Sequence, residues 1–179
     1  MEKVELTPDI DIFNHKPMVK TELKKISKFL KEKRIKWYIQ SSFAGRLYGI
    51  KNRKVTDIDI RVNYPLKKLF SQIKKDYNSK AKLKPPRRYG KGEFRDYCIA
   101  IPLGHTHLDI VSDLITYNKQ DDTEYNLPFD RQYRFVSWEK MKIPICSLRY
   151  LVSYKLINRR NKSERKNDTK EAAYLLKMF

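Results

Sequence analysis

A chain of 179 residues, 40% of them hydrophobic, is long enough to bury a core and too apolar for a disordered polymer. We therefore expect a single domain spanning residues 1–179. The 40 Lys and Arg residues outnumber the 21 Asp and Glu residues, giving a formal charge of +19. This charge favours a polyanionic partner, although genome bias or life at high temperature also enriches lysine. No stretch has the roughly eighteen apolar residues of a membrane span, and no signal peptide is evident, so we expect a cytoplasmic protein without a membrane partner.

The first predicted elements are a helix, a strand and a second helix. Apolar residues at helical spacing between lysines predict an amphipathic helix over residues 18–34. A short strand is expected at residues 37–40. Ser41 and Ser42 follow it and are typical of residues that cap a helix, which then ends at Gly49.

The next segment carries two aspartates on a predicted strand. Polar and apolar residues alternate over residues 57–62, as in a half-buried strand, so Asp57 and Asp59 share one face. Pro65 begins another amphipathic helix, which reaches Tyr77. The stretch from there to Gly92 is rich in Lys, Arg, Pro and Gly, and we predict a basic loop.

The second half predicts more strands and two terminal helices. Residues 97–101 and 107–111 form two expected strands, and alternation places His107, Asp109 and Val111 on one face. A polar loop is expected from Asn118 to Asn126. The remaining predicted elements are a strand at 131–137 and helices at about 147–158 and 167–178, packed on the core. Strands interleaved with helices predict an α/β or α+β fold with a mixed sheet and flanking helices.

Asp57 and Asp59 suggest metal-assisted phosphoryl chemistry. Attack of a hydroxyl on a phosphate requires divalent cations, and two aspartates at i and i+2 on a strand can share them. A third carboxylate from a neighbouring strand would complete the site. The apolar flanks of Asp109 favour it for this role, although a lone Asp-x-Asp also occurs as a solvated strand edge. The competing carboxylates are Glu93, Asp96 and Asp113.

The serine turn and the aspartates together resemble a known signature. The residues concerned are 37–44, Gly49, Arg53, Thr56, Asp57 and Asp59. They resemble the DNA polymerase beta-like nucleotidyltransferase superfamily, in which a Gly-Ser or Gly-Gly turn precedes a helix and an Asp-x-Asp. The similar branch contains aminoglycoside and lincosamide nucleotidyltransferases and abortive-infection-type toxins that act on transfer RNA. The terminal region 143–176 resembles its terminal helices.

The chain departs from that pattern at two places. Ser41 stands where the usual first glycine would, which restricts how closely the turn approaches a triphosphate. Asn167 interrupts the terminal Lys-Asp pair formed by Lys166 and Asp168.

The resemblance implies a nucleotidyltransferase fold and two Mg²⁺ ions, with Mn²⁺ as an alternative. Asp57 and Asp59 would bind both ions, and Asp109 would hold the catalytic ion and help to deprotonate the attacking hydroxyl. A nucleoside triphosphate such as ATP would be bound by the turn and by nearby cations, some of which could equally be surface residues. The implied nucleotide-binding residues are Ser41, Ser42, Arg46, Arg53, Lys155 and Lys166.

The charge favours RNA, such as the end of a transfer RNA, as the acceptor, because a cationic aminoglycoside calls for an acidic cleft. A toxin of this type would have a protein antitoxin as a partner. The residues predicted to track nucleic acid are Arg87, Arg88, Lys91, Arg159 and Arg160. Nearby tyrosines suited to base stacking are Tyr64, Tyr77, Tyr89 and Tyr97. His107 is either a proton-transfer residue or a structural histidine.

Two other functions stay open from the sequence. One is nucleotidyl transfer to a protein or to a small molecule such as an antibiotic. The other is a basic nucleic-acid-binding module that kept the fold without turnover; Ser41 favours this reading, whereas intact Asp57, Asp59 and Asp109 argue against it.

Overall fold

A computed structural model gives the fold of the chain. It describes residues 16–50, 55–85, 87–89, 93–95, 97–103, 106–112, 114–118, 123–157 and 162–179. Among the helices in these ranges, none is long and apolar enough to cross a membrane.

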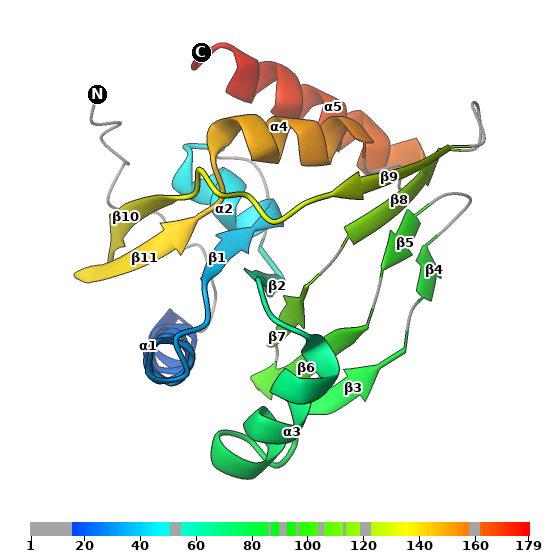
Figure 1. The fold of residues 1–179 in the computed structure, drawn as a ribbon. Coiled ribbons are helices and arrows are strands. Elements are labelled where there is room, and N and C mark those ends of the chain that lie inside the picture. Colours follow the sequence, from blue (N-terminus) through cyan, green and yellow to red (C-terminus); the bar gives the residue numbers. More distant parts are fainter. Residues whose placement is uncertain are drawn as a thin grey trace.

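The centre of the fold is a seven-stranded sheet (Figure 1). The pairs β1–β11 and β2–β7 are parallel and the other neighbours antiparallel, which confirms the predicted mixed sheet. In spatial order the strands are β10 (Arg134–Trp138), β11 (Met141–Ile145), β1 (Trp37–Gln40), β2 (Asp57–Val62), β7 (Thr106–Val111), β6 (Cys98–Leu103) and β3 (Lys82–Lys84).

A second, antiparallel sheet has four strands. They are β4 (Arg87–Tyr89), β5 (Glu93–Arg95), β8 (Leu114–Asn118) and β9 (Thr123–Leu127). Two predicted loops are therefore wrong. The basic stretch that ends at Gly92 contains β3 and β4, and the polar stretch 118–126 contains most of β9. Backbone hydrogen bonds hold such strands together whatever the charge of their side chains. The polar composition of these stretches therefore gave no indication of strands.

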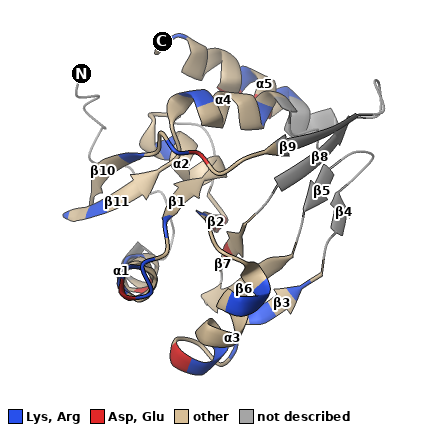
Figure 2. Ribbon diagram, in the orientation of Figure 1, with Lys and Arg blue, Asp and Glu red and all other residues tan. Residues whose placement is uncertain are grey.

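Helices lie on both sides of the large sheet. Figure 1 shows α4 and α5 side by side at the top of the view, with α1 and α3 at the bottom. The helices are α1 (Lys16–Glu32), α2 (Ser41–Leu47), α3 (Leu66–Asp76), α4 (Leu148–Ile157) and α5 (Lys162–Leu176). Figure 2 shows Lys and Arg spread over several of these helices and the sheet edges rather than gathered on one element.

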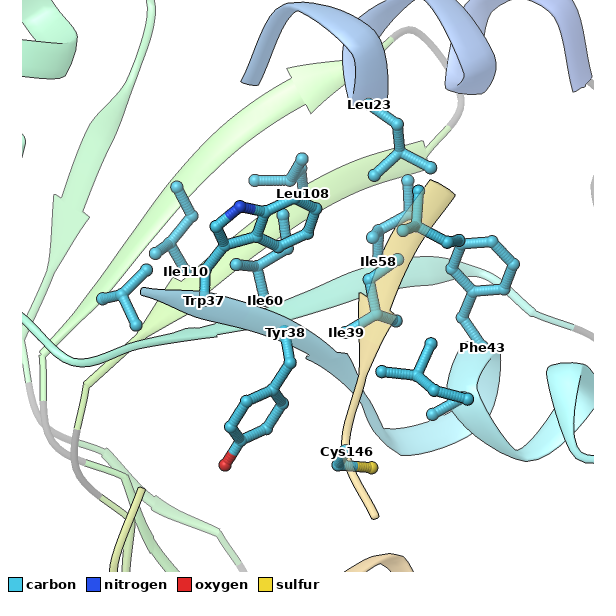
Figure 3. Packing of buried hydrophobic residues seen from close by; sticks show 14 of the residues in the cluster. Leu23, Trp37, Tyr38, Ile39, Phe43, Ile58, Ile60, Leu108, Ile110 and Cys146 are labelled. Atoms are coloured by element: carbon cyan, nitrogen blue, oxygen red, sulfur yellow. The ribbon is translucent and has the colours of Figure 1, made fainter. Parts of the chain in front are cut away.

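Strand alternation separates the apolar and polar faces of the sheet. Leu23 of α1 lies over the face that carries Ile58 and Ile60, and all three side chains are fully buried (Figure 3). Tyr38 points to the opposite side in the same view. Because successive side chains on a strand alternate, Asp57 and Asp59 lie on the face opposite α1.

Candidate active site

Two neighbouring parallel strands place three carboxylates on one face. In the register of β2 and β7, Asp59 is opposite Asp109 and Asp57 is opposite His107. Neighbouring strands are about 4.8 Å apart, so these positions are adjacent. Asp59 and Asp109 are only 3% and 4% exposed, although both lie on a strand's polar face. The structure therefore brings together the three carboxylates expected from the sequence.

His107 contacts two of these carboxylates. Its Nε2 lies 3.5 Å from Oδ2 of Asp109 and 3.8 Å from Oδ2 of Asp57. The hydrogen bond to Asp109 raises the pKa of His107 above its ordinary value, and the negative charges of Asp109 and Asp57 act in the same direction. Partial burial and the charge of Lys84 oppose this shift, but do not cancel it. Without a metal ion, the imidazolium form neutralises part of the carboxylate cluster.

Lys84 is a second cation at the same face, and it was not among the site residues predicted from the sequence. Its Nζ lies 3.7 Å from Oδ1 of Asp109. Strand β3 pairs with β6, and β6 pairs with β7, so Lys84 reaches Asp109 across one intervening strand. The sequence offers only the alternation Lys82-Leu83-Lys84, which is too short to distinguish a strand from the predicted basic loop.

Ser41 adopts a left-handed backbone conformation, which favours glycine. Its φ is +63°, in the left-handed region that disfavours residues with a Cβ. Helix α2 begins at Ser41 itself; Gln40 occupies the N-cap position and makes no side-chain capping bond. The prediction that Ser41 and Ser42 cap this helix is therefore wrong in detail. Both serines are buried where β1 turns into α2.

The predicted nucleotide-binding cations occupy different environments. Arg46 is buried, and its Nη1 donates a 3.0 Å hydrogen bond to the carbonyl of Ile50, just beyond α2. Lys166 is exposed on α5. Arg53 lies outside the described residues. Contacts of Arg46 and Lys166 with a nucleotide therefore stay predictions.

Lys155 is buried between the two C-terminal helices. Its Nζ lies 3.4 Å from Oδ1 of Asp168 and also forms an ion pair with Glu171. The side chain is 2% exposed. Lys155 therefore joins α4 to α5, and would have to exchange these carboxylates for a phosphate to serve a nucleotide.

The predicted nucleic-acid residues fall where side chains are not described. Arg87 and Arg88 belong to β4, and only their strand placement is known. Lys91, Arg159 and Arg160 lie outside the described residues. Of the competing carboxylates, Asp96 and Asp113 also lie outside them. Glu93 belongs to β5, which pairs with β4 and β8 rather than with β2.

A buried arginine continues the polar face of β2. Arg61 is 0% exposed and follows Asp59 by two positions. Its Nη1 donates a 2.7 Å hydrogen bond to the hydroxyl of Tyr150 in α4, and its Nη2 donates to the carbonyl of Leu127 in β9. The hydroxyl of Tyr150 donates a 3.4 Å hydrogen bond to Oε1 of Gln40. This network connects β2 with α4 and β9. The alternation Asp57-x-Asp59-x-Arg61 indicates in the sequence that Arg61 shares the face of the two aspartates.

The donor set fits a divalent metal. Three carboxylates from adjacent strands offer the hard oxygen ligands that Mg²⁺ prefers. Within the described ranges, however, no three His, Cys, Asp or Glu side chains already converge as a metal-binding group. His107 and Lys84 instead contact these carboxylates. An incoming cation would have to displace His107 and Lys84 from these carboxylates.

Comparison with known proteins identifies the fold. No protein-family model and no curated protein sequence matches the chain. Its structure is similar to that of a candidate nucleotidyltransferase from Thermotoga maritima, with a TM-score of 0.60 and 22% identity, covering 91% of this chain and 95% of that one. An antigenic nucleotidyltransferase-like protein from Paracoccidioides brasiliensis gives a TM-score of 0.59 and 16% identity, over 90% and 77% of the two chains.

A third similar structure is the lincosamide antibiotic adenylyltransferase LnuA bound to lincomycin, with a TM-score of 0.52 and 15% identity, over 87% of this chain and 96% of that one. The chain therefore has the nucleotidyltransferase fold, as predicted.

Proposed function

We propose that the protein is a metal-dependent nucleotidyltransferase that moves a nucleoside monophosphate from a nucleoside triphosphate to an acceptor hydroxyl. The observation that supports this most is the register of β2 and β7, which sets Asp109 opposite Asp59 and beside Asp57. The fold supports the same activity, because the serine turn, Asp57 and Asp59 occupy one strand–helix–strand unit, β1–α2–β2.

The residues divide the reaction between them. The acceptor oxygen attacks the α-phosphorus, the bond from that phosphorus to the bridging oxygen breaks, and pyrophosphate leaves. Asp57 and Asp59 would hold the divalent ions, which neutralise the phosphate oxygens when bound. Asp109 would complete the ligand set and orient the acceptor hydroxyl for loss of its proton. The Ser42 hydroxyl and the N–H groups of the turn would donate hydrogen bonds to the triphosphate oxygens.

RNA is the acceptor that the charge favours. A protein with a formal charge of +19 attracts a polyanion and repels a cationic aminoglycoside. A small-molecule acceptor is the second candidate, because a lincosamide adenylyltransferase is among the similar structures. Pairing with a protein antitoxin stays a prediction from the sequence resemblance.

Incubation with labelled substrates tests this proposal. Each α-labelled nucleoside triphosphate would be mixed with the protein, Mg²⁺ and total cellular RNA. We expect label on RNA with the unmodified protein and none with Asp59→Asn or after chelation of the metal. Label on a protein or on an added lincosamide would identify that molecule, instead of RNA, as the acceptor. The absence of metal-dependent transfer from every nucleotide to all of these acceptors would refute the activity.

A further inference from the structure

A cavity of about 520 Å³ lies where both carboxylate strands end. Strand β2 ends at Val62, and Asn63 and Tyr64 follow it along the cavity wall. Strand β7 ends at Val111, and Ser112 lines the cavity next. A volume of this size accommodates a small organic molecule. The cavity therefore lies at the carboxyl ends of β2 and β7, the two strands that carry the candidate active-site carboxylates.

Aromatic rings and ammonium groups meet at this cavity. Tyr64, Tyr97 and Phe129 line it, and each is partly buried. Nζ of Lys67, another lining residue, lies 4.7 Å from the centroid of the Tyr97 ring. Lys68, next in the sequence, does not line the cavity, but its Nζ lies 5.8 Å from the centroid of the Tyr64 ring. Flat apolar surfaces beside positive charges match a nucleotide, whose base stacks and whose phosphate is anionic.

Of the four tyrosines predicted from the sequence to suit base stacking, Tyr64 and Tyr97 line this cavity. Tyr77 does not line this cavity; its hydroxyl donates a 2.9 Å hydrogen bond to Glu22, and its ring packs 5.6 Å from that of Phe29. The side chain of Tyr89 lies outside the described residues. Tyr64 and Tyr97 come from distant parts of the chain and still line the same cavity.

Phe129, the third aromatic residue that lines the cavity, is held in place by the core. The Phe129 ring packs 4.8 Å from that of Tyr38, and the backbone N–H of Asp130 donates a 3.1 Å hydrogen bond to the Tyr38 hydroxyl. Tyr38 is fully buried in the core. A wall fixed in this way loses little conformational entropy when a planar ring binds against it.

We propose that this cavity binds an unpaired nucleotide of a single-stranded RNA acceptor, with its base stacked on Tyr64 or Tyr97 and its phosphate beside Lys67 and Lys68. The inference rests on the proposed function for the class of acceptor. Asn63 is four positions beyond Asp59, roughly 13 Å along the strand. The bound nucleotide is therefore a neighbour of the reacting end, and the cavity positions the strand that carries the acceptor hydroxyl.

A binding measurement without turnover tests this site. The probe is a short single-stranded RNA with a free 3′-hydroxyl and a fluorescent base analogue, titrated in the absence of nucleoside triphosphate. We expect Tyr97→Ala or Tyr64→Ala, or both, to weaken binding about 5- to 150-fold, because one stacked base contributes roughly 1–3 kcal/mol. Tyr97→Phe and Tyr64→Phe keep the ring and should bind nearly as well as the unmodified protein.

Phe135 provides a matched control. Its ring also lies under a lysine, with Nζ of Lys142 at 5.1 Å, but it is 55% exposed and does not line the cavity. Phe135→Ala should therefore leave RNA affinity unchanged. Equal affinities for Tyr97→Ala, Tyr64→Ala and Phe135→Ala would overturn the proposal, as would alanine and phenylalanine variants that bind alike.

The outcome can be separated from that of the proposed function. The same titration would be repeated with Asp59→Asn, which should bind the probe through the same rings. Ring-dependent binding without nucleotidyl transfer would refute only the proposed activity. Transfer to RNA without ring dependence would refute only the cavity as the binding site.

Discussion

Ser41 holds a backbone conformation that suits glycine. At φ +63°, the left-handed conformation costs a residue with a Cβ roughly 1–2 kcal/mol. Glycine avoids this strain, but it loses roughly 0.5–1 kcal/mol more in conformational entropy when the chain folds. We therefore expect Ser41→Gly to raise the free energy of unfolding by up to about 1 kcal/mol in urea titrations. Ser42→Gly is the control. Ser42 has no positive φ, so this variant should have a lower free energy of unfolding than the unmodified protein. Equal losses in both variants would contradict this view of the turn.

His107 should titrate above its ordinary value in the metal-free protein. The hydrogen bond to Asp109 raises its folded-state pKa, so its contribution to stability is complete below the unfolded pKa of about 6.5 and is lost as the pH rises through the folded value. The NMR signal of the imidazole, assigned with His107→Gln, measures this pKa. We expect Mg²⁺ to lower the pKa of His107, because the ion would bind the same carboxylates. A metal-free pKa at or below the ordinary value would show that the contact with Asp109 is not made.

At the scale of elements, Arg61 ties β2 to α4 and β9. Replacing Arg61 by Met would leave the Tyr150 hydroxyl and the Leu127 carbonyl buried without their donor. A buried group left unsatisfied costs roughly 1–3 kcal/mol, so we expect Arg61→Met to lower the free energy of unfolding by at least about 2 kcal/mol. Tyr150→Phe removes a single hydroxyl and should cost less. Denaturant unfolding of both variants checks the order, and a harmless Arg61→Met would refute the proposed connection.

The elements differ in how well the sequence predicts them. In β2 every second residue is apolar over six positions, so its face and its aspartates could be predicted. Strand β3 contains a single apolar residue, Leu83, and three residues are too few to define a period. Lys84 was missed for this reason. The ion pairs of Lys155 join two helices through residues 13 and 16 positions away, which the spacing of residues within one helix does not reveal.

At the scale of the whole molecule, the charge of +19 should govern RNA binding. Each neutralised phosphate releases counterions, so affinity should fall log-linearly with salt. Replacing Arg87, Arg88 and Lys91 together by Ala should flatten the slope by up to about two to three units, because each contact contributes roughly 0.7–0.9. Nucleotide affinity should barely change. An unaltered slope in fluorescence titrations would exclude this segment from the RNA path.

The central claim is that Asp57, Asp59 and Asp109 form one metal-dependent catalytic unit. Initial rates of nucleotidyl transfer in Mg²⁺ should be compared for the unmodified protein, Asp109→Asn and Glu93→Gln, with folding checked by circular dichroism. Asp109 is opposite Asp59, whereas Glu93 belongs to the other sheet. We expect Asp109→Asn to abolish transfer and Glu93→Gln to retain it. A folded Asp109→Asn protein with near-normal turnover would contradict the account.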